Sequence, residues 1–147
     1  MSTLTAECKT TILLVEDDEV DVMGIKRAFR INKMTEVNYV ARNGLEALQL
    51  LRGSQELAPV ATRDRLLIIS DINMPKMSCI EFLRELRQDP KLASIPVVLL
   101  TTSDEDKDRI DAYKLNVAGY ILKPLTFSRL TETIAALGKY WRLNEIP

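Results

Sequence analysis

The chain contains no histidine, and this absence removes several kinds of chemistry at once. A Ser-His-Asp triad, a histidine-ligated metal and a phosphohistidine carrier all need an imidazole ring. Acid-base or phosphoryl chemistry in this protein must therefore depend on carboxylates, hydroxyls or lysine.

Cysteine is also scarce, with only Cys8 and Cys79 among 147 residues. Two cysteines do not form a disulfide framework, so we predict reduced thiols in a cytoplasmic protein. Residues 1–9 lack the apolar core of a signal peptide. No apolar run approaches the length of about 20 residues that a membrane-spanning helix needs, so no membrane contact is expected.

The chain has little net charge, because it contains 20 basic and 21 acidic side chains. This balance gives no reason to expect direct binding to nucleic acid. With 46% hydrophobic residues, the chain is long enough to bury a core as one domain. We predict a flexible N-terminus at 1–10, one domain over 11–143 and a C-terminal tail at 144–147.

Five short apolar segments alternate with helical patterns, which predicts an α/β fold with a parallel sheet and helices on both faces. The segments are 12–15, 37–40, 66–69, 97–100 and 119–122, and the second is mixed enough to be an edge strand. Helix caps are expected at four positions: Asp18, Asn43, Ser78 and Ser103. The long segment from Gly53 to Arg65 is predicted to be an exposed loop.

Polar residues follow four of these strands. Asp71 ends the most apolar one, and the others are followed by Glu16-Asp17-Asp18, Thr101-Thr102 and Lys123-Pro124. Parallel strands bring their carboxyl ends to one edge, where open α/β sheets bind ligands. Clustered carboxylates without histidine or cysteine favour Mg²⁺, and a hydroxyl with a lysine suits a phosphoryl group. Each residue alone has a structural explanation, such as a turn at Asp71, but their coincidence at successive strand ends favours a site.

These segments together resemble the receiver domain of two-component response regulators. The resemblance covers roughly residues 11 to 141 and is carried by Leu14-Val15-Glu16-Asp17-Asp18, Ser70-Asp71-Ile72-Asn73-Met74-Pro75, Leu100-Thr101-Thr102 and Gly119-Tyr120-Ile121-Leu122-Lys123-Pro124. It implies a doubly wound five-stranded parallel sheet of flavodoxin-like order 2-1-3-4-5.

The resemblance also implies a role for each matching residue. Asp71 would be the phosphoacceptor, and Mg²⁺ would be bound by Asp71, Asp17, the backbone carbonyl of Asn73 and, through water, Glu16. Phosphate oxygens would contact Thr101 and Lys123, and Tyr120 would be the aromatic residue of the switch. The family often has a cis bond where this chain has Lys123-Pro124.

The chain departs from the family pattern at three positions. Ser78-Cys79 replaces the usual Asp-Gly, so the loop after Asp71 must turn without that glycine. Glu16 replaces the commoner aspartate, and Asn116, which tolerates a left-handed conformation, replaces a glycine before the last strand. None of these changes removes a chemical group that the site needs.

We therefore predict a stand-alone signalling receiver rather than a conventional enzyme. Asp71 would accept a phosphoryl group from a sensor histidine kinase, and the signal would leave through a changed surface or by onward phosphoryl transfer. The loop from Gly53 to Arg65 and the ending Lys139-Tyr140-Trp141 also resemble the small regulators paired with bacterial phytochromes.

Three alternatives are less well supported. A phosphatase of the haloacid-dehalogenase type needs a second aspartate two residues after its nucleophile, and here that position is Asn73. A flavin module needs a glycine-rich phosphate loop after the first strand, which this chain lacks. A degenerate receiver that only binds partners would not need the intact acidic, threonine and lysine set.

A homodimer is also expected, through the last strand and the last helix. The predicted dimer face contains Leu125, Phe127 and Trp141. Trp141 lies near the end of the helix, where we expect little sheet to cover it. The alternative is that the apolar stripe formed by Leu130, Ile134, Leu137 and Trp141 packs only against the protein's own sheet.

Overall fold

The computed structural model describes residues 10–32, 37–56, 58–62, 65–72, 74, 76–102, 105–124 and 126–143. The predicted tail at 144–147 and nearly all of the N-terminus at 1–10 lie outside this part of the chain.

Five parallel strands form one sheet in the order β2-β1-β3-β4-β5, which confirms the predicted topology. All five apolar segments are strands, and their bounds are β1 (Thr11–Val15), β2 (Val37–Ala41), β3 (Leu66–Ser70), β4 (Val97–Thr101) and β5 (Gly119–Leu122). The mixed segment is the edge strand β2, as expected. Every residue of β3 and β4 is buried, because helices cover both faces of the sheet.

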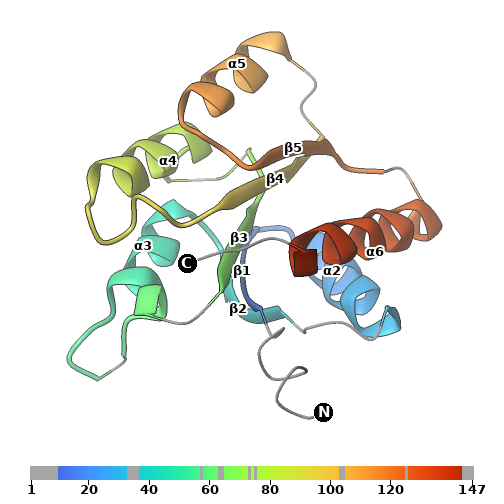
Figure 1. The fold of residues 1–147 in the computed structure, drawn as a ribbon, viewed down its shortest axis with the longest axis horizontal. Coiled ribbons are helices and arrows are strands. Elements are labelled where there is room, and N and C mark those ends of the chain that lie inside the picture. Colours follow the sequence, from blue (N-terminus) through green and yellow to red (C-terminus); the bar gives the residue numbers. More distant parts are fainter. Residues whose placement is uncertain are drawn as a thin grey trace.

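The helices divide between the two faces of the sheet, as Figure 1 shows. On one face lie α2 (Glu19–Ile31) and α6 (Phe127–Leu143). On the other lie α3 (Gly44–Arg52), α4 (Cys79–Gln88) and α5 (Asp106–Lys114). Alternating side chains of the central strands therefore enter two separate hydrophobic cores. Among the described residues, no helix has the length and apolar character needed to cross a membrane.

Side-chain caps fix the starts of three helices where the sequence predicts them. Asp18 Oδ1 accepts the N–H groups of Val20 and Asp21 at 2.8 and 3.2 Å. Asn43 and Ser78 cap α3 and α4 in the same way. The prediction for α5 is wrong, because that helix begins at Asp106, after an N-cap at Glu105. Ser103 itself lies outside the described residues.

Trp141 is buried, so the prediction that it is exposed is wrong. Only 5% of its surface is accessible, and it packs in the core between α2, α6 and the sheet. Arg65, just before β3, donates a hydrogen bond of 3.1 Å to the Trp141 carbonyl. The end of α6 therefore still lies beside the start of β3, where core residues cover the indole.

Three further backbone features bear on the sequence predictions. Residues 53–65 are not wholly an exposed loop, because Val60 in the short 3-10 helix η1 (Val60–Thr62) is buried. No peptide bond between described residues is cis, so Lys123-Pro124 is trans. Asn116 adopts the expected left-handed conformation, with φ of 58°, and the loop after Asp71 makes a similar turn at Lys76, with φ of 67°.

Candidate functional site

The carboxyl edge of the sheet brings together the acidic, hydroxyl and lysine residues predicted from the sequence. Glu16 follows β1, Asp71 follows β3, Thr101 ends β4 and Lys123 follows β5. Backbone hydrogen bonds fix this arrangement, because the Asp71 N–H donates to the Val15 carbonyl at 3.1 Å and the Lys123 N–H donates to the Thr101 carbonyl at 2.8 Å. The predicted convergence of these strand ends is therefore confirmed.

The Lys123 ammonium lies at the centre of the site. Its Nζ is 2.6 Å from Glu16 Oε1, 2.8 Å from Asp21 Oδ2 and 3.6 Å from Asp71 Oδ2. The first two contacts are short hydrogen bonds, whereas the third is an ion pair at longer range. Three carboxylates thus share one ammonium, and these four side chains together retain a net negative charge.

Glu16 is the most buried carboxylate of this group, with 2% of its surface exposed. Both of its oxygens have partners, since Oε1 accepts from Lys123 and Oε2 accepts the Asp18 N–H at 3.3 Å. Burial raises the pKa of Glu16, and the hydrogen bond from Lys123 opposes that rise. Glu16 is therefore a paired internal carboxylate.

The charge of Lys123 is secured by its carboxylate partners. Burial alone would lower the pKa of this lysine, but hydrogen bonds to Asp21 and Glu16 outweigh that effect, and the pKa is raised above its ordinary value. Lys123 is therefore a fixed cation at neutral pH, and its side chain is only 12% exposed.

Asp71 presents one anchored oxygen and one oxygen that faces the lysine. Its Oδ1 accepts the Ile72 N–H at 2.7 Å, and its Oδ2 faces Lys123. Behind it, the Ser70 hydroxyl donates to the Asp71 carbonyl at 2.9 Å and lies 3.9 Å from the buried Cys79 thiol. Burial raises the pKa of Cys79 to about 12, so this thiol remains protonated and takes no part in acid-base chemistry at neutral pH.

The two predicted switch residues lie on neighbouring strands. Thr101 is buried at the end of β4, whereas Tyr120 on β5 is partly buried against the core beneath α3, α4 and α5. The Arg109 guanidinium of α5 lies 6.0 Å from the centre of the Tyr120 ring. Tyr120 is therefore in contact with α5 through Arg109.

The predicted metal ligands are brought together only in part. Asp17 is exposed beside the buried Glu16, and Asn73 lies outside the described residues. Within the part of the chain that the structure describes, no three acidic, cysteine or histidine side chains form a group that could hold a metal ion. The donors at this edge are nevertheless carboxylate oxygens with excess negative charge, which suits a hard cation such as Mg²⁺.

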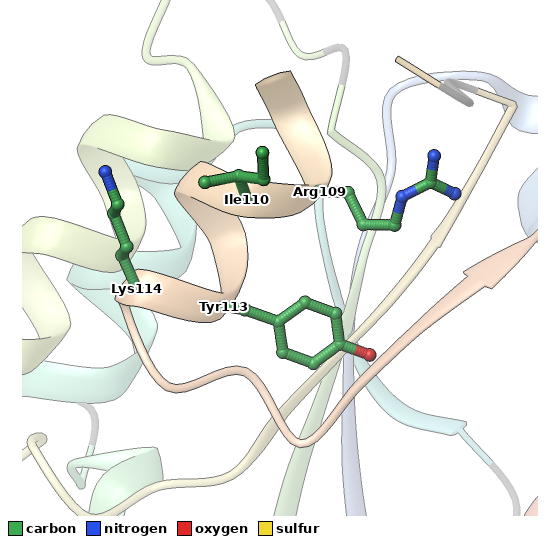
Figure 2. A pocket seen from close by; sticks show the side chains of 4 residues that line it. All are labelled: Arg109, Ile110, Tyr113 and Lys114. Atoms are coloured by element: carbon green, nitrogen blue, oxygen red, sulfur yellow. The ribbon is translucent and has the colours of Figure 1, made fainter. Parts of the chain in front are cut away.

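A shallow hollow of about 580 Å³ lies elsewhere, on α5. Figure 2 shows its lining side chains, which are Arg109, Ile110, Tyr113 and Lys114. None of them belongs to the carboxylate site, although Arg109 also contacts Tyr120. Ile110 and Tyr113 are 55% and 52% exposed, so the hollow is part of an apolar surface with a basic margin.

One of the three residues of the predicted dimer face is not available at the surface. Trp141 is buried, and Leu125 lies outside the described residues. Phe127 is 37% exposed, and the Arg27 guanidinium lies 4.8 Å from the centre of its ring. The homodimer remains a prediction, but the packing of Trp141 no longer supports it.

Sequence reasoning missed Asp21 as a member of the site. The available signal was its place in the first turn of α2, because a helix that follows a strand begins beside the carboxyl edge of the sheet.

Comparison with known proteins agrees with this geometry. A sequence model of the response regulator receiver domain matches residues 12–135. The chain therefore belongs to the response regulator receiver domain family of two-component signalling.

Two relatives and two solved structures show where in the family the similarity lies. The probable methanogenesis regulatory protein FilR2 of Methanothrix harundinacea is 36% identical over 94% of this chain and 87% of its own. The response regulator Rcp1 of Synechocystis is 33% identical over 88% of this chain and 87% of its own. A solved Mn²⁺-bound form of a response regulator Rcp1 gives a TM-score of 0.80, with 30% identity over 94% of this chain and 99% of that one. The phosphorylated cyanobacterial phytochrome response regulator RcpA gives a TM-score of 0.81, with 33% identity over 95% of this chain and 99% of that one.

Proposed function

We propose that this protein is a stand-alone receiver that accepts a phosphoryl group on Asp71 from a sensor histidine kinase. The observation that carries the proposal is the placement of Lys123, whose ammonium lies between Glu16, Asp21 and Asp71 at the carboxyl edge. Membership of the receiver family gives this arrangement its chemical context.

The transfer is a displacement at phosphorus. Asp71 Oδ2, which faces Lys123, attacks the phosphorus of a phosphohistidine on the kinase. The O–P bond forms as the P–N bond breaks, and the bond electrons leave with the kinase imidazole. Lys123 offsets the negative charge on the phosphoryl oxygens, and Asp71 Oδ1 remains anchored by the Ile72 N–H.

We assign Mg²⁺ to the same edge, held by Asp17, Asp71 and the Asn73 carbonyl, with Glu16 nearby. When bound, the ion neutralises phosphoryl charge and helps to orient the oxygens. The Mn²⁺-bound Rcp1 structure supports a divalent cation as the cofactor. Lys123 supplies a fixed positive charge of its own in this negative region.

The output of the switch is a changed surface that includes α5. Thr101 contacts the phosphoryl group, and Tyr120 moves with it and alters the position of Arg109. The apolar hollow on α5 beside Arg109 then offers a different face to a partner protein (Figure 2). This is a two-state change that new phosphoryl contacts bias.

We further propose that the kinase carries a light-absorbing phytochrome module, as the similarity to RcpA suggests. FilR2, which is also similar to this chain, is named as a probable methanogenesis regulatory protein, and that is a different physiological setting. The neighbouring genes distinguish the two settings, because a phytochrome kinase beside this gene supports the first and its absence from the genome rejects it.

Acetyl phosphate tests the phosphoacceptor directly, because it supplies the phosphoryl group without a kinase. With Mg²⁺, intact-protein mass spectrometry should show a single phosphoryl gain. Chelation of the metal and the Asp71→Asn change should each abolish that gain. A wild-type protein that is folded but never modified would instead favour the alternative, a degenerate receiver that acts only by binding partners.

A further inference from the structure

Asp21 is a short-range partner of Lys123 that the phosphotransfer chemistry does not require. Its Oδ2 accepts a hydrogen bond of 2.8 Å from the ammonium. The backbone of Asp21 is fixed by the helix cap, because its N–H donates to Asp18 Oδ1 at 3.2 Å. The first turn of α2 therefore holds a carboxylate in position to retain Lys123.

A lysine that keeps both of its present hydrogen bonds has one proton left for a phosphoryl group. Its Nζ is 3.6 Å from Asp71 Oδ2, which is beyond a normal hydrogen bond. An ammonium has three protons, and two of them already point to Glu16 and Asp21. A phosphoryl group on Asp71 adds three strong acceptors, so a second hydrogen bond from the lysine to these oxygens would replace the bond to Glu16 or the bond to Asp21.

Burial decides which bond is exchanged. Glu16 has a side chain only 2% exposed, and loss of its cation would leave a buried, unpaired charge at high cost. Asp21 has a side chain 41% exposed, so water can replace the lysine there. Loss of the hydrogen bond to Asp21 therefore costs less free energy than loss of the one to Glu16.

We propose that Asp21 is a positioning residue that holds Lys123 in the resting state and competes with the phosphoryl group for it. The inference rests on the proposed phosphoacceptor role of Asp71. On phosphorylation the lysine keeps Glu16, leaves Asp21 and binds the phosphoryl oxygens. Asp21 thereby favours the resting state of the switch.

Beryllofluoride, which coordinates a carboxylate oxygen as a phosphoryl mimic, provides the test. Its affinity is measured by calorimetry at saturating Mg²⁺ for wild type, Asp21→Asn and Glu19→Gln. Glu19 is the matched control, because it is an acidic residue of the same helical turn that pairs with Arg42 rather than Lys123. Removal of a partly exposed partner should strengthen binding about twofold to fivefold in Asp21→Asn and leave Glu19→Gln near wild type.

A crystal structure of the wild-type beryllofluoride complex separates competition from simple repulsion of an anion. The Lys123–Asp21 hydrogen bond should be broken and the Lys123–Glu16 bond retained. Equal affinity in the two variants, weaker binding in Asp21→Asn, or a persistent Lys123–Asp21 bond would overturn the inference but leave Asp71 as the phosphoacceptor. A wild type that binds no beryllofluoride would instead reject the proposed function.

Discussion

Replacement of Arg87 by alanine should cost much more stability than replacement of Arg84, an exposed arginine of the same helix α4. The guanidinium donates to four backbone carbonyls, those of Leu115, Ile95, Ala93 and Asn116, at 2.8, 2.8, 2.9 and 3.1 Å. One side chain therefore ties the end of α4 to the turns that precede β4 and β5. Those strands carry Thr101 and Lys123 to the site.

The size of the effect follows from the burial of these bonds. The bonds to Leu115 and Ile95 are partly buried, and burial also lowers the pKa of Arg87. Hydrogen bonds from charged groups contribute about 1.5 kcal/mol each at the low end, so these two supply about 3 kcal/mol. The bonds to Ala93 and Asn116 are exposed and add little, because water can replace them. Arg87→Lys should recover only part of the loss, because an ammonium lacks the planar fork.

Urea unfolding followed by Trp141 fluorescence measures this difference, since the indole is buried in the folded state. Arg84→Ala is the matched control, because Arg84 is an exposed arginine of the same helix, and it should change the free energy of unfolding by less than about 0.5 kcal/mol. A loss below about 1 kcal/mol for Arg87→Ala, or a loss equal to that of Arg84→Ala, would show that the four bonds do not hold the two turns.

Four further predictions concern packing, oligomeric state, backbone conformation and burial. Trp141→Ala should lower the free energy of unfolding by about 3 to 5 kcal/mol without changing the oligomeric state. The predicted dimer is tested separately by sedimentation equilibrium of the wild type and of Phe127→Ala. A wild type that is monomeric at high micromolar concentration would reject the dimer. Lys76→Gly should stabilise the protein by about 0.5 to 1 kcal/mol in urea unfolding, because its φ of 67° is strained for lysine, and a loss of stability would contradict this. Stability should also fall as pH rises from 9.0 towards about 12, because unfolding releases the Cys79 proton that the folded core retains, and this slope should be shallower in Cys79→Ala.

The topology was predictable because its signals are local and repeated. Each buried strand is an apolar run, and Asp18, Asn43 and Ser78 mark the helix starts by caps that the structure confirms. The carboxyl edge followed from topology alone, since parallel strands bring Glu16, Asp71, Thr101 and Lys123 to one side. Asn116 was also predictable, because few side chains tolerate a left-handed conformation.

What could not be predicted depends on contacts between distant segments. The partner of Lys123 on α2 is 102 residues away in sequence, and no periodicity identifies it. The burial of Trp141 depends on how far α6 extends along the sheet, which helical spacing does not determine. In the sequence, Arg87 looks like an ordinary surface arginine. Its hydrogen bonds exist only because α4 packs beside the turns before β4 and β5.

Asp71 is the residue that we propose carries the phosphoryl group. Borohydride reduces an acyl phosphate to an alcohol, so it converts a phosphorylated aspartate into homoserine and marks its position. After phosphorylation with acetyl phosphate and Mg²⁺, reduction and peptide mass spectrometry should find this conversion at Asp71 and at no other carboxylate. Conversion at Asp17, Asp21 or any other acidic residue, with Asp71 unmodified, would show that Asp71 is not the phosphoacceptor.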